Sequence, residues 1–466
     1  MKNSKLWQAL ETLSSEERHR FALFVQSPYF NSQPMVTAFF DAFAERCWQK
    51  GLPPDKAALH QQLYPALPYD DHRIRLLMSK LFKLLEVFWK VEKSDTEMPW
   101  SVPQAYRQRQ LPKHFEQALR QAQRQLSTSP ERSSRYFLDQ YLLADETYRQ
   151  RAQEKRTSSL NLHEADQYLN IFYCIAKLRQ ACLAKSHQFV FPTDYEIALL
   201  EELLQHLRGN PLLQEPAVAA YYHSYHYLHE SSDAARHFDA FLDLISGPKL
   251  AVFPAEELQD MFLLALNFCT RQYNLGSSAY LQAQLQLYKL GLEKGLLLQQ
   301  GQLSPFTYRN ITTLGLILED YEWVDNFLEH YRAAMPVNRA DQMYHFCKAR
   351  LEYAKGKYGA ALQRLNEVHF GEPLLQLSVR TVRLKLFYET SAFDVLEARM
   401  HALEKFIRRK KALSYHRENY LNLLHFLRQL QELPPGEKNA REALADEIKA
   451  CPNVAERTWL LRQLST

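Results

Sequence analysis

The stretch Lys355–Leu365, KGKYGAALQRL, holds two of the chain's 12 glycines and lies between two segments of helical character. Gly356 suits the left-handed residue that ends a helix. Tyr358, Ala361 and Leu365 then occupy the aromatic, small and large positions of the second helix of a tetratricopeptide unit. A small residue is needed at Ala361 because the two helices cross there and bulk would hold them apart. The stretch therefore predicts a helical hairpin with its turn at Gly356.

The same spacing recurs in neighbouring parts of the chain. Tyr321 lies 37 residues before Tyr358, Phe393 lies 35 residues after it, and Tyr280 takes the aromatic position of a fourth unit. In these other three units the small position is taken by Val324, Leu396 and Ala283. Such hairpins bury their apolar faces only by stacking on neighbours. The spacing therefore predicts an all-α protein with a right-handed α-solenoid of degenerate tetratricopeptide-like helical hairpins.

The composition supports a helical, water-soluble chain. Of 466 residues, 46% are hydrophobic, which is enough for a large or a long continuous core, and the scarcity of glycine favours helix. The 57 basic and 53 acidic residues are too evenly balanced to indicate nucleic-acid or membrane binding by themselves. No apolar run is long enough for a signal peptide or a membrane span, so we expect a cytoplasmic protein without membrane insertion. The six cysteines form no CxxC pair and are expected to be free thiols.

The first 95 residues are expected to form a separate helical domain. Ser14 followed by Glu17 is a capping-box pattern that starts a helix, and Ser27 before Pro28 ends it. The stretch 94–104, SDTEMPWSVPQ, contains two prolines that break the helical period. We therefore expect an N-terminal helical domain at 1–95 and the helical-repeat solenoid at 104–466.

Five blocks of the chain, at 13–31, 63–88, 169–182, 379–414 and 456–464, together resemble an uncharacterised bacterial family of tetratricopeptide-like helical-repeat proteins. The most specific parts are the SPYFN block near the N-terminus and the RRKKALS block near the C-terminus. The resemblance covers the chain from its first helix to its last ten residues. It implies the fold and the full-length organisation, and it brings no catalytic residues with it.

The common catalytic and cofactor motifs do not occur in this sequence. HEADQ at His163 and HESSD at His229 begin like zinc-protease motifs, but Gln167 and Asp233 stand where the second histidine is required. Neither GxGxxG nor GxxxxGK[ST] is found. We therefore expect no cofactor, no metal site and no enzymatic activity.

A histidine-rich segment, YYHSYHYLHE at 221–230, is the most unusual local cluster. Its histidines, at His223, His226 and His229, fall within about a third of a helix circumference. This arrangement is compatible with a metal or proton-sensitive contact, and also with an aromatic first helix whose histidines lie at the surface. Tyr222 and His226 are candidate partner-binding residues.

Two basic stretches offer further candidates. The first, KFIRRKKALSYHR, places Arg408, Arg409, Lys410 and Lys411 near a helix end, where they complement the helix dipole or dock an acidic partner, phosphate or nucleic acid. The second has cations at Arg107, Arg109, Lys113, Arg120 and Arg124. We expect the second set to form the solvent face of a helix whose apolar side holds Phe115, Leu119 and Ala122.

The favoured function is a non-enzymatic scaffold or adaptor that binds a protein or peptide partner in a helical-repeat groove. The alternative is a DNA-binding regulator with a helix-turn-helix-like N-terminal head and a repeat-containing sensor or interaction region. In that alternative the nucleic-acid contacts would be Arg73, Arg75, Lys80 and Lys83. Against it, no alternating hairpin follows that could form a wing.

Overall fold

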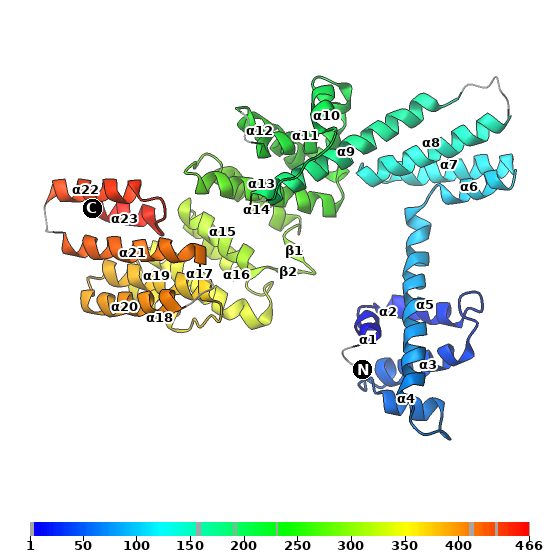
Figure 1. The fold of residues 1–466 in the computed structure, drawn as a ribbon, viewed down its shortest axis with the longest axis horizontal. Coiled ribbons are helices and arrows are strands. Elements are labelled where there is room, and N and C mark those ends of the chain that lie inside the picture. The colour runs from blue at the N-terminus through cyan, green and yellow to red at the C-terminus, as the bar shows by residue number, and fades with distance from the viewer. Residues whose placement is uncertain are drawn as a thin grey trace. The chain divides into compact units, whose positions relative to one another are not determined.

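The computed structural model describes residues 4–154, 160–189, 191, 193–229, 232–409, 414–433 and 437–465. In these residues the chain is helical apart from its turns and one small hairpin of strands, β1 (Leu298–Gln299) and β2 (Gln302–Leu303). The prediction of an all-α protein is thus confirmed (Figure 1). In the same residues no helix has the length and apolar character that a membrane span requires. Contacts divide the chain into two units, Met1–Cys174 and Ile175–Thr466.

The first unit consists of helices joined by short loops. Its helices are α1 (Lys5–Glu11), α2 (Ser15–Gln26), α3 (Pro34–Ala44), α4 (Lys56–Leu63), α5 (Asp71–Glu97), α6 (Ser101–Gln108), α7 (Pro112–Thr128), α8 (Ser134–Glu154) and the first half of α9 (Leu162–Gln188), with a π-helical turn at Glu45–Gln49. Helices α1 to α5 surround a core of their own, whose largest members are Phe21, Phe39, Phe40, Phe43 and Phe88.

The start and end of α2 follow the local sequence signals. The Ser14 hydroxyl accepts a hydrogen bond from the Glu17 N–H at 3.2 Å, and the Glu17 carboxylate accepts one from the Ser14 N–H at 2.8 Å. The helix ends at Gln26 because Ser27, ahead of proline, takes an extended conformation with ψ of 119°. The capping box predicted from the sequence is confirmed.

The segment expected to be a linker is mostly helical. Helix α5 continues to Glu97, and α6 begins at Ser101 with Pro103 in its first turn. Proline is tolerated there because the first N–H groups of a helix have no partner within the helix. The irregular part is therefore shorter than expected. The division between the two contact units falls inside α9.

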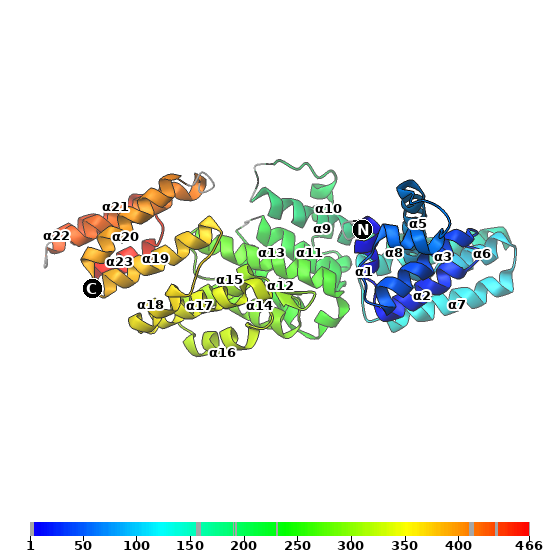
Figure 2. The same cartoon turned by 90° about the horizontal axis from the view of Figure 1, so that it is seen from below.

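The second unit is a succession of helix pairs. After the second half of α9 come α10 (Leu200–Leu207), α11 (Pro216–Leu228), α12 (Ala234–Ser246), α13 (Ala255–Asn274), α14 (Leu281–Glu293), α15 (Pro305–Ile317), α16 (Tyr321–Tyr331), α17 (Val337–Ala354), α18 (Tyr358–Asn366), α19 (Pro373–Glu389), α20 (Phe393–Arg409), α21 (Ser414–Glu432), α22 (Lys438–Ala450) and α23 (Arg457–Ser465). Short 3-10 turns lie at Pro211–Gln214 and Pro248–Val252. Consecutive pairs pack on one another in chain order, as Figure 2 shows for α13 to α18.

The turns of three hairpins share one geometry. Tyr321, Tyr358 and Phe393 are the first residues of α16, α18 and α20. Two positions before each aromatic residue the backbone is left-handed, with φ of 58° at Glu319, 74° at Gly356 and 53° at Ser391. In each turn the residue after the left-handed one donates its N–H to the carbonyl of the residue five positions earlier, at 2.8 to 3.0 Å. The turn predicted at Gly356 is confirmed, and its neighbours form the same turn without glycine.

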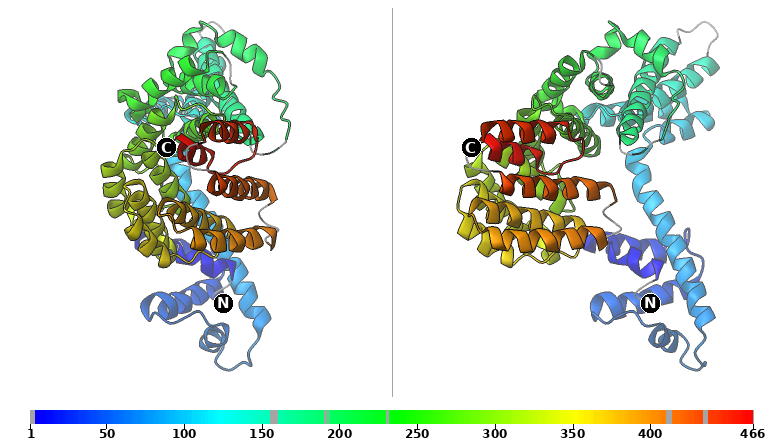
Figure 3. Two further views of the ribbon diagram at one scale, coloured as in Figure 1. Left: turned by 90° about the vertical axis from the view of Figure 1, so that its left-hand side faces the viewer. Right: turned by 60° about the vertical axis from the view of Figure 1, so that its left-hand side comes forward.

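The position predicted to need a small residue is fully buried in these three hairpins, at Ala361, Val324 and Leu396. In the α15/α16 pair the space comes from the other helix. A Cβ atom added to Gly315 of α15 would lie 2.3 Å from Cγ2 of Val324. In this pair the small residue at the contact between the helices is Gly315 of α15, which leaves room for valine on α16. Figure 3 shows the later hairpins, coloured yellow to red, in successive layers.

In the fourth hairpin the register differs by one residue from the prediction. Helix α14 begins at Leu281 rather than at Tyr280, and Gln284 is buried where Ala283 was expected. The Gln284 side-chain amide donates to the Thr270 hydroxyl of α13 at 2.7 Å, so this buried amide has a hydrogen-bond partner between the two helices.

Candidate partner-binding surface

The first helices of three successive hairpins, α15, α17 and α19, present equivalent side chains to one another. Thr313, Arg350 and Lys385 each lie eight residues before the aromatic residue that begins the second helix. Arg350 donates from Nη1 to the Thr313 hydroxyl at 2.6 Å, from α17 to α15. The Lys385 ammonium lies 5.1 Å from the ring centroid of Tyr353, from α19 to α17. Side chains at or near the same position of neighbouring first helices therefore contact one another from α15 to α17 and from α17 to α19.

Two arginines lie together on this surface. Arg309 is one turn before Thr313 on α15, and its guanidinium lies 5.7 Å from the Phe306 ring centroid. Burial lowers the pKa of Arg309, and the positive charge of Arg350 lowers it further. Both arginines are half-buried, and in the described part of the chain neither forms an ion pair with a carboxylate. This pair of cations, which we call the groove arginines, has no ion-pair partner among the described residues, although the charge of the Glu456 carboxylate, which is paired with Lys385, acts on Arg350.

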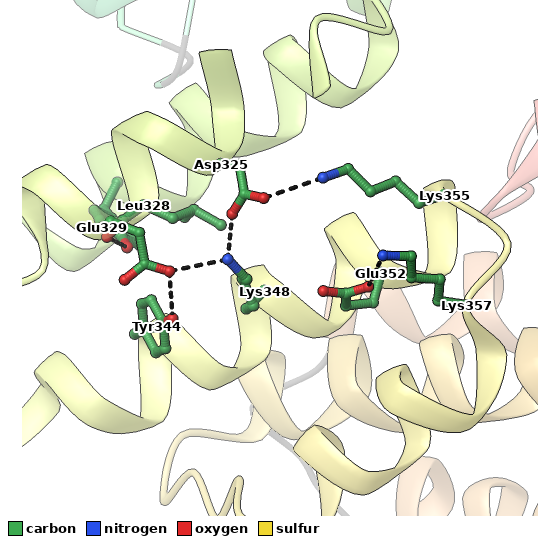
Figure 4. A network of polar contacts seen from close by, with 9 residues as sticks. Asp325, Leu328, Glu329, Tyr344, Lys348, Glu352, Lys355 and Lys357 are labelled. Carbon is green, nitrogen blue, oxygen red and sulfur yellow. Dashed lines mark hydrogen bonds and ion pairs between the residues drawn. The ribbon is translucent and has the colours of Figure 1, made fainter. Parts of the chain in front are cut away.

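A network of charged contacts joins α16 to α17 (Figure 4). Lys348 is buried and donates to Glu329 at 2.9 Å and to Asp325. Tyr344 donates to Glu329 at 2.7 Å, and Lys355 donates to Asp325 at 3.1 Å. The carboxylates and ammonium groups satisfy one another across two neighbouring hairpins.

This network also adjusts the ionisation of its members. Hydrogen bonds from Tyr344 and Lys348 lower the pKa of Glu329. Burial acts to raise the pKa of Asp325, but the hydrogen bonds from Lys348 and Lys355 outweigh it and the pKa is lowered. The network borders an open recess of about 590 Å³. Because its charges are paired, we interpret it as a structural connection between hairpins rather than a binding site.

The carboxylate of Glu389 connects helix α23 to the hairpins before it. The Glu389 carboxylate, at the end of α19, accepts hydrogen bonds from Tyr353 at 2.9 Å, Trp459 at 3.1 Å and Gln463 at 2.9 Å. Trp459 is 5% exposed and packs edge-on against Tyr388. Helix α23 is therefore held against α17 and α19 by a carboxylate with several donors.

The histidines of α11 pack within their own hairpin. His226 stacks on His237 of α12 with ring centroids 4.4 Å apart, and its ring lies 4.5 Å from that of Tyr222. His223 and His237 share a hydrogen between their Nδ1 atoms at 2.8 Å. Tyr222 is 7% exposed, and His229 points to solvent. The described residues hold no group of three or more His, Cys, Asp or Glu side chains arranged for a metal.

Acid is expected to destabilise this hairpin. Burial, followed by the charge of His237, lowers the pKa of His223 and His226 from 6.5 to about 4. The unfolded chain therefore binds more protons between about pH 6.5 and 4, so stability is lost as the pH falls through that range. Allowing for partial exposure, we expect a loss on the order of 1 kcal/mol for each histidine. Melting followed by circular dichroism at pH 7 and pH 5 measures this loss.

A His226→Phe variant provides the control for the acid experiment, because it keeps a stacked ring and removes one titrating group. Its melting temperature should fall less between pH 7 and pH 5 than that of the wild type. Equal falls for both proteins would show that His226 does not carry the effect. The charges of Arg208, Arg236 and Asp233 act on these histidines.

The basic stretch at the end of α20 is only partly described. Arg408 is exposed and pairs with Glu404 at 2.8 Å, and Glu404 also accepts from Arg428 at 2.8 Å. Arg409 is exposed at the last turn of the helix. Lys410 and Lys411 lie outside the described residues.

The candidate nucleic-acid contacts of the head lie on α5. Arg73 pairs with Asp70 at 3.1 Å, and Arg75 pairs with Asp71 at 2.6 Å. Lys80 donates to the side chain of Gln33 at 2.6 Å, and Lys83 is exposed. Acidic residues in the first turn of α5 thus offset the charge of both arginines.

The second basic stretch does not form one solvent face. Arg107 lies in α6 and Arg109 caps the end of that helix, whereas α7 begins only at Pro112. The Arg107 side chain is 12% exposed and bonds to Glu146 of α8 at 2.6 Å. Phe115 and Ala122 are buried as expected, whereas Leu119 is half-buried.

The groove arginines were not identified from the sequence, although a signal for one of them was present. Counting eight residues back from each aromatic of the repeated frame leads to Thr313, Arg350 and Lys385. Nothing in the sequence shows that Arg309 lies near Arg350, or that neither arginine forms an ion pair with a carboxylate. No family model, curated protein or solved structure matches this chain.

Proposed function

We propose that the chain is a non-enzymatic scaffold or adaptor that binds a protein or peptide partner. In this proposal the hairpins from α11 onward form a right-handed α-solenoid of tetratricopeptide-like units, and the first helices line its binding groove. Extended peptides commonly bind along such surfaces in repeat proteins. The partner would present an acidic side chain to the groove.

The observation that carries the proposal is the pair of groove arginines, Arg309 and Arg350. Two half-buried like charges without an ion pair cost free energy, and the nearby Glu456 carboxylate already pairs with Lys385, so an acidic group from a partner would stabilise them. An acidic side chain from a partner would pair with the planar guanidinium groups in charge-assisted hydrogen bonds. Exposed apolar side chains of the first helices, such as Phe306 at 44% exposure, add contact area beside them.

The proposal is tested by quantitative affinity capture from the native host with the full chain as bait. We expect a discrete partner whose recovery falls about tenfold when Arg309→Gln and Arg350→Gln are combined, because two charge-assisted contacts are lost. The matched control is Arg120→Gln combined with Arg124→Gln, which removes the same charge from exposed positions of α7. Equal recovery with both variants, or the absence of any discrete partner, would contradict the proposal.

The DNA-binding alternative has no comparable observation in its favour, since Arg73 and Arg75 already pair with acids of their own helix. It would require a gel shift with genomic DNA fragments at low salt that weakens steeply as salt rises. Loss of that shift in an Arg73→Gln, Arg75→Gln variant would assign it to α5.

A further inference from the structure

A second group of arginines lies between α19 and α20. Arg380 and Arg383 are three residues apart on α19 and thus share one face of that helix. Arg399 belongs to α20, which packs on α19, and its charge acts on both of them. Arg383 points roughly 160° away from Lys385 around the axis of α19. This cluster, which we call the arginine triad, is therefore distinct from the groove arginines.

The triad lacks counter-charges in the described part of the chain. No ion pair joins any of its members to a carboxylate there, and the charged groups that act on Arg380 and Arg383 are other arginines. Several acids of nearby elements have other partners. They are Glu372 with Arg339, Glu404 with Arg408 and Arg428, Glu389 with its hydrogen-bond donors, and Glu367 and Glu397 with His345 and His401 when these are protonated. Asp394, at the start of α20, forms no ion pair with Arg399 in the described residues.

Local contacts hold two of the three guanidinium groups in place. Arg383 donates from Nη2 to the carbonyl of Leu365 at 2.7 Å, near the C-terminal end of α18. The Arg380 guanidinium lies 4.2 Å from the ring centroid of Phe406 on α20. The negative end of the α18 dipole accounts for one cation at this place, but not for three. Burial and like charge lower the pKa of Arg380 and Arg383, so the grouping is unfavourable in the free protein.

We propose that Arg380, Arg383 and Arg399 bind a phosphoryl group. A phosphate dianion carries enough charge and enough acceptor oxygens for several guanidinium forks at once, whereas one carboxylate offers two oxygens and a single charge. Two of the forks are pre-positioned by the Leu365 carbonyl and the Phe406 ring, which lowers the entropic cost of binding. A free phosphate ester and a phosphorylated side chain share this chemistry. The inference stands independently of the proposed groove.

The test is calorimetric titration of the purified full-length protein, in a phosphate-free buffer, with inorganic pyrophosphate and separately with a short phosphoserine peptide. We expect saturable binding of at least one probe that weakens as salt is raised. Combining Arg380→Gln with Arg399→Gln should weaken it about tenfold or more, because two charge-assisted contacts are removed. Binding of pyrophosphate indicates a site for free phosphate compounds, and binding of the peptide alone indicates recognition of a phosphorylated partner.

A control variant assigns the binding to the triad. Arg120→Gln combined with Arg124→Gln removes two exposed cations from α7, in the first unit. It should bind the probes within about twofold of the wild type. If neither probe binds the wild type, or if the α7 variant loses as much binding as the triad variant, the proposal is overturned.

The stability of the free protein gives a second, independent readout. Removing one of three like charges relieves repulsion, so Arg399→Gln should raise the melting temperature without ligand while it weakens binding. Arginines with a purely structural role would give a lower melting temperature in this variant. That outcome, together with unchanged binding, would also overturn the proposal.

Discussion

Replacing Glu146 by alanine is expected to destabilise the first unit strongly. Its carboxylate bonds to Arg107 at 2.6 and 3.3 Å and accepts from Gln104 at 2.8 Å, and the paired side chains are only 5% and 12% exposed. Alanine would leave the Arg107 charge buried without a partner. Breaking a buried pair from one side costs about 3–5 kcal/mol of the free energy of unfolding. Urea denaturation of the full chain, with hydrogen exchange read at the amides of α6 to α8, measures the loss.

The neighbouring residue supplies a matched control for this substitution. Asp145 lies on the same helix, α8, and its carboxylate pairs with Arg149, which is largely exposed. Asp145→Ala should therefore cost about 1 kcal/mol or less, as is usual for surface pairs. The Glu146 prediction is wrong if both substitutions change the free energy of unfolding by the same amount. Because chains with more than one unit do not generally unfold in a single step, the comparison is restricted to amides of the first unit.

Local signals in the sequence were sufficient to predict the helices and several of their ends. The Ser14 capping box and the left-handed turn at Gly356 depend only on neighbouring residues, so composition and spacing determine them. The frame of Tyr321, Tyr358 and Phe393 was also found from spacing, because an aromatic residue begins each of α16, α18 and α20. The prolines of the expected linker misled the prediction, since one of them lies in the permissive first turn of α6.

Pairing between distant residues could not be predicted from this single sequence. Arg107 and Glu146 are separated by 39 residues, and nothing near Arg107 indicates that it is buried. The arginine triad posed the same difficulty, because the sequence does not show whether an arginine forms an ion pair with a carboxylate in the folded protein. Such charges are recognised only when the neighbouring carboxylates can be assigned to other partners.

Replacing Gly315 by alanine should destabilise the α15/α16 hairpin. The new Cβ would lie 2.3 Å from Cγ2 of Val324, closer than two carbon atoms approach, and Val324 is fully buried. Overpacking of this kind costs about 1–3 kcal/mol. Alanine's better helix propensity, worth about 1 kcal/mol, offsets only part of the cost. Chemical denaturation of the full chain, with hydrogen exchange of α15 and α16, provides the measurement.

Two further variants separate the steric explanation from a general intolerance of substitution. Gly359→Ala, in the first turn of α18, meets no atom within 4 Å of its added Cβ, so the same substitution should be neutral or stabilising there. In the α15/α16 hairpin, Val324→Ala opens space opposite Gly315, and the methyl group of Gly315→Ala would fill part of it. The double variant should therefore be more stable than the sum of the two single effects, with a coupling of about 1 kcal/mol or more. If the changes in the free energy of unfolding simply add, the side chains at positions 315 and 324 do not compete for one space. Gly315 would then not be the small residue that lets α15 and α16 pack closely.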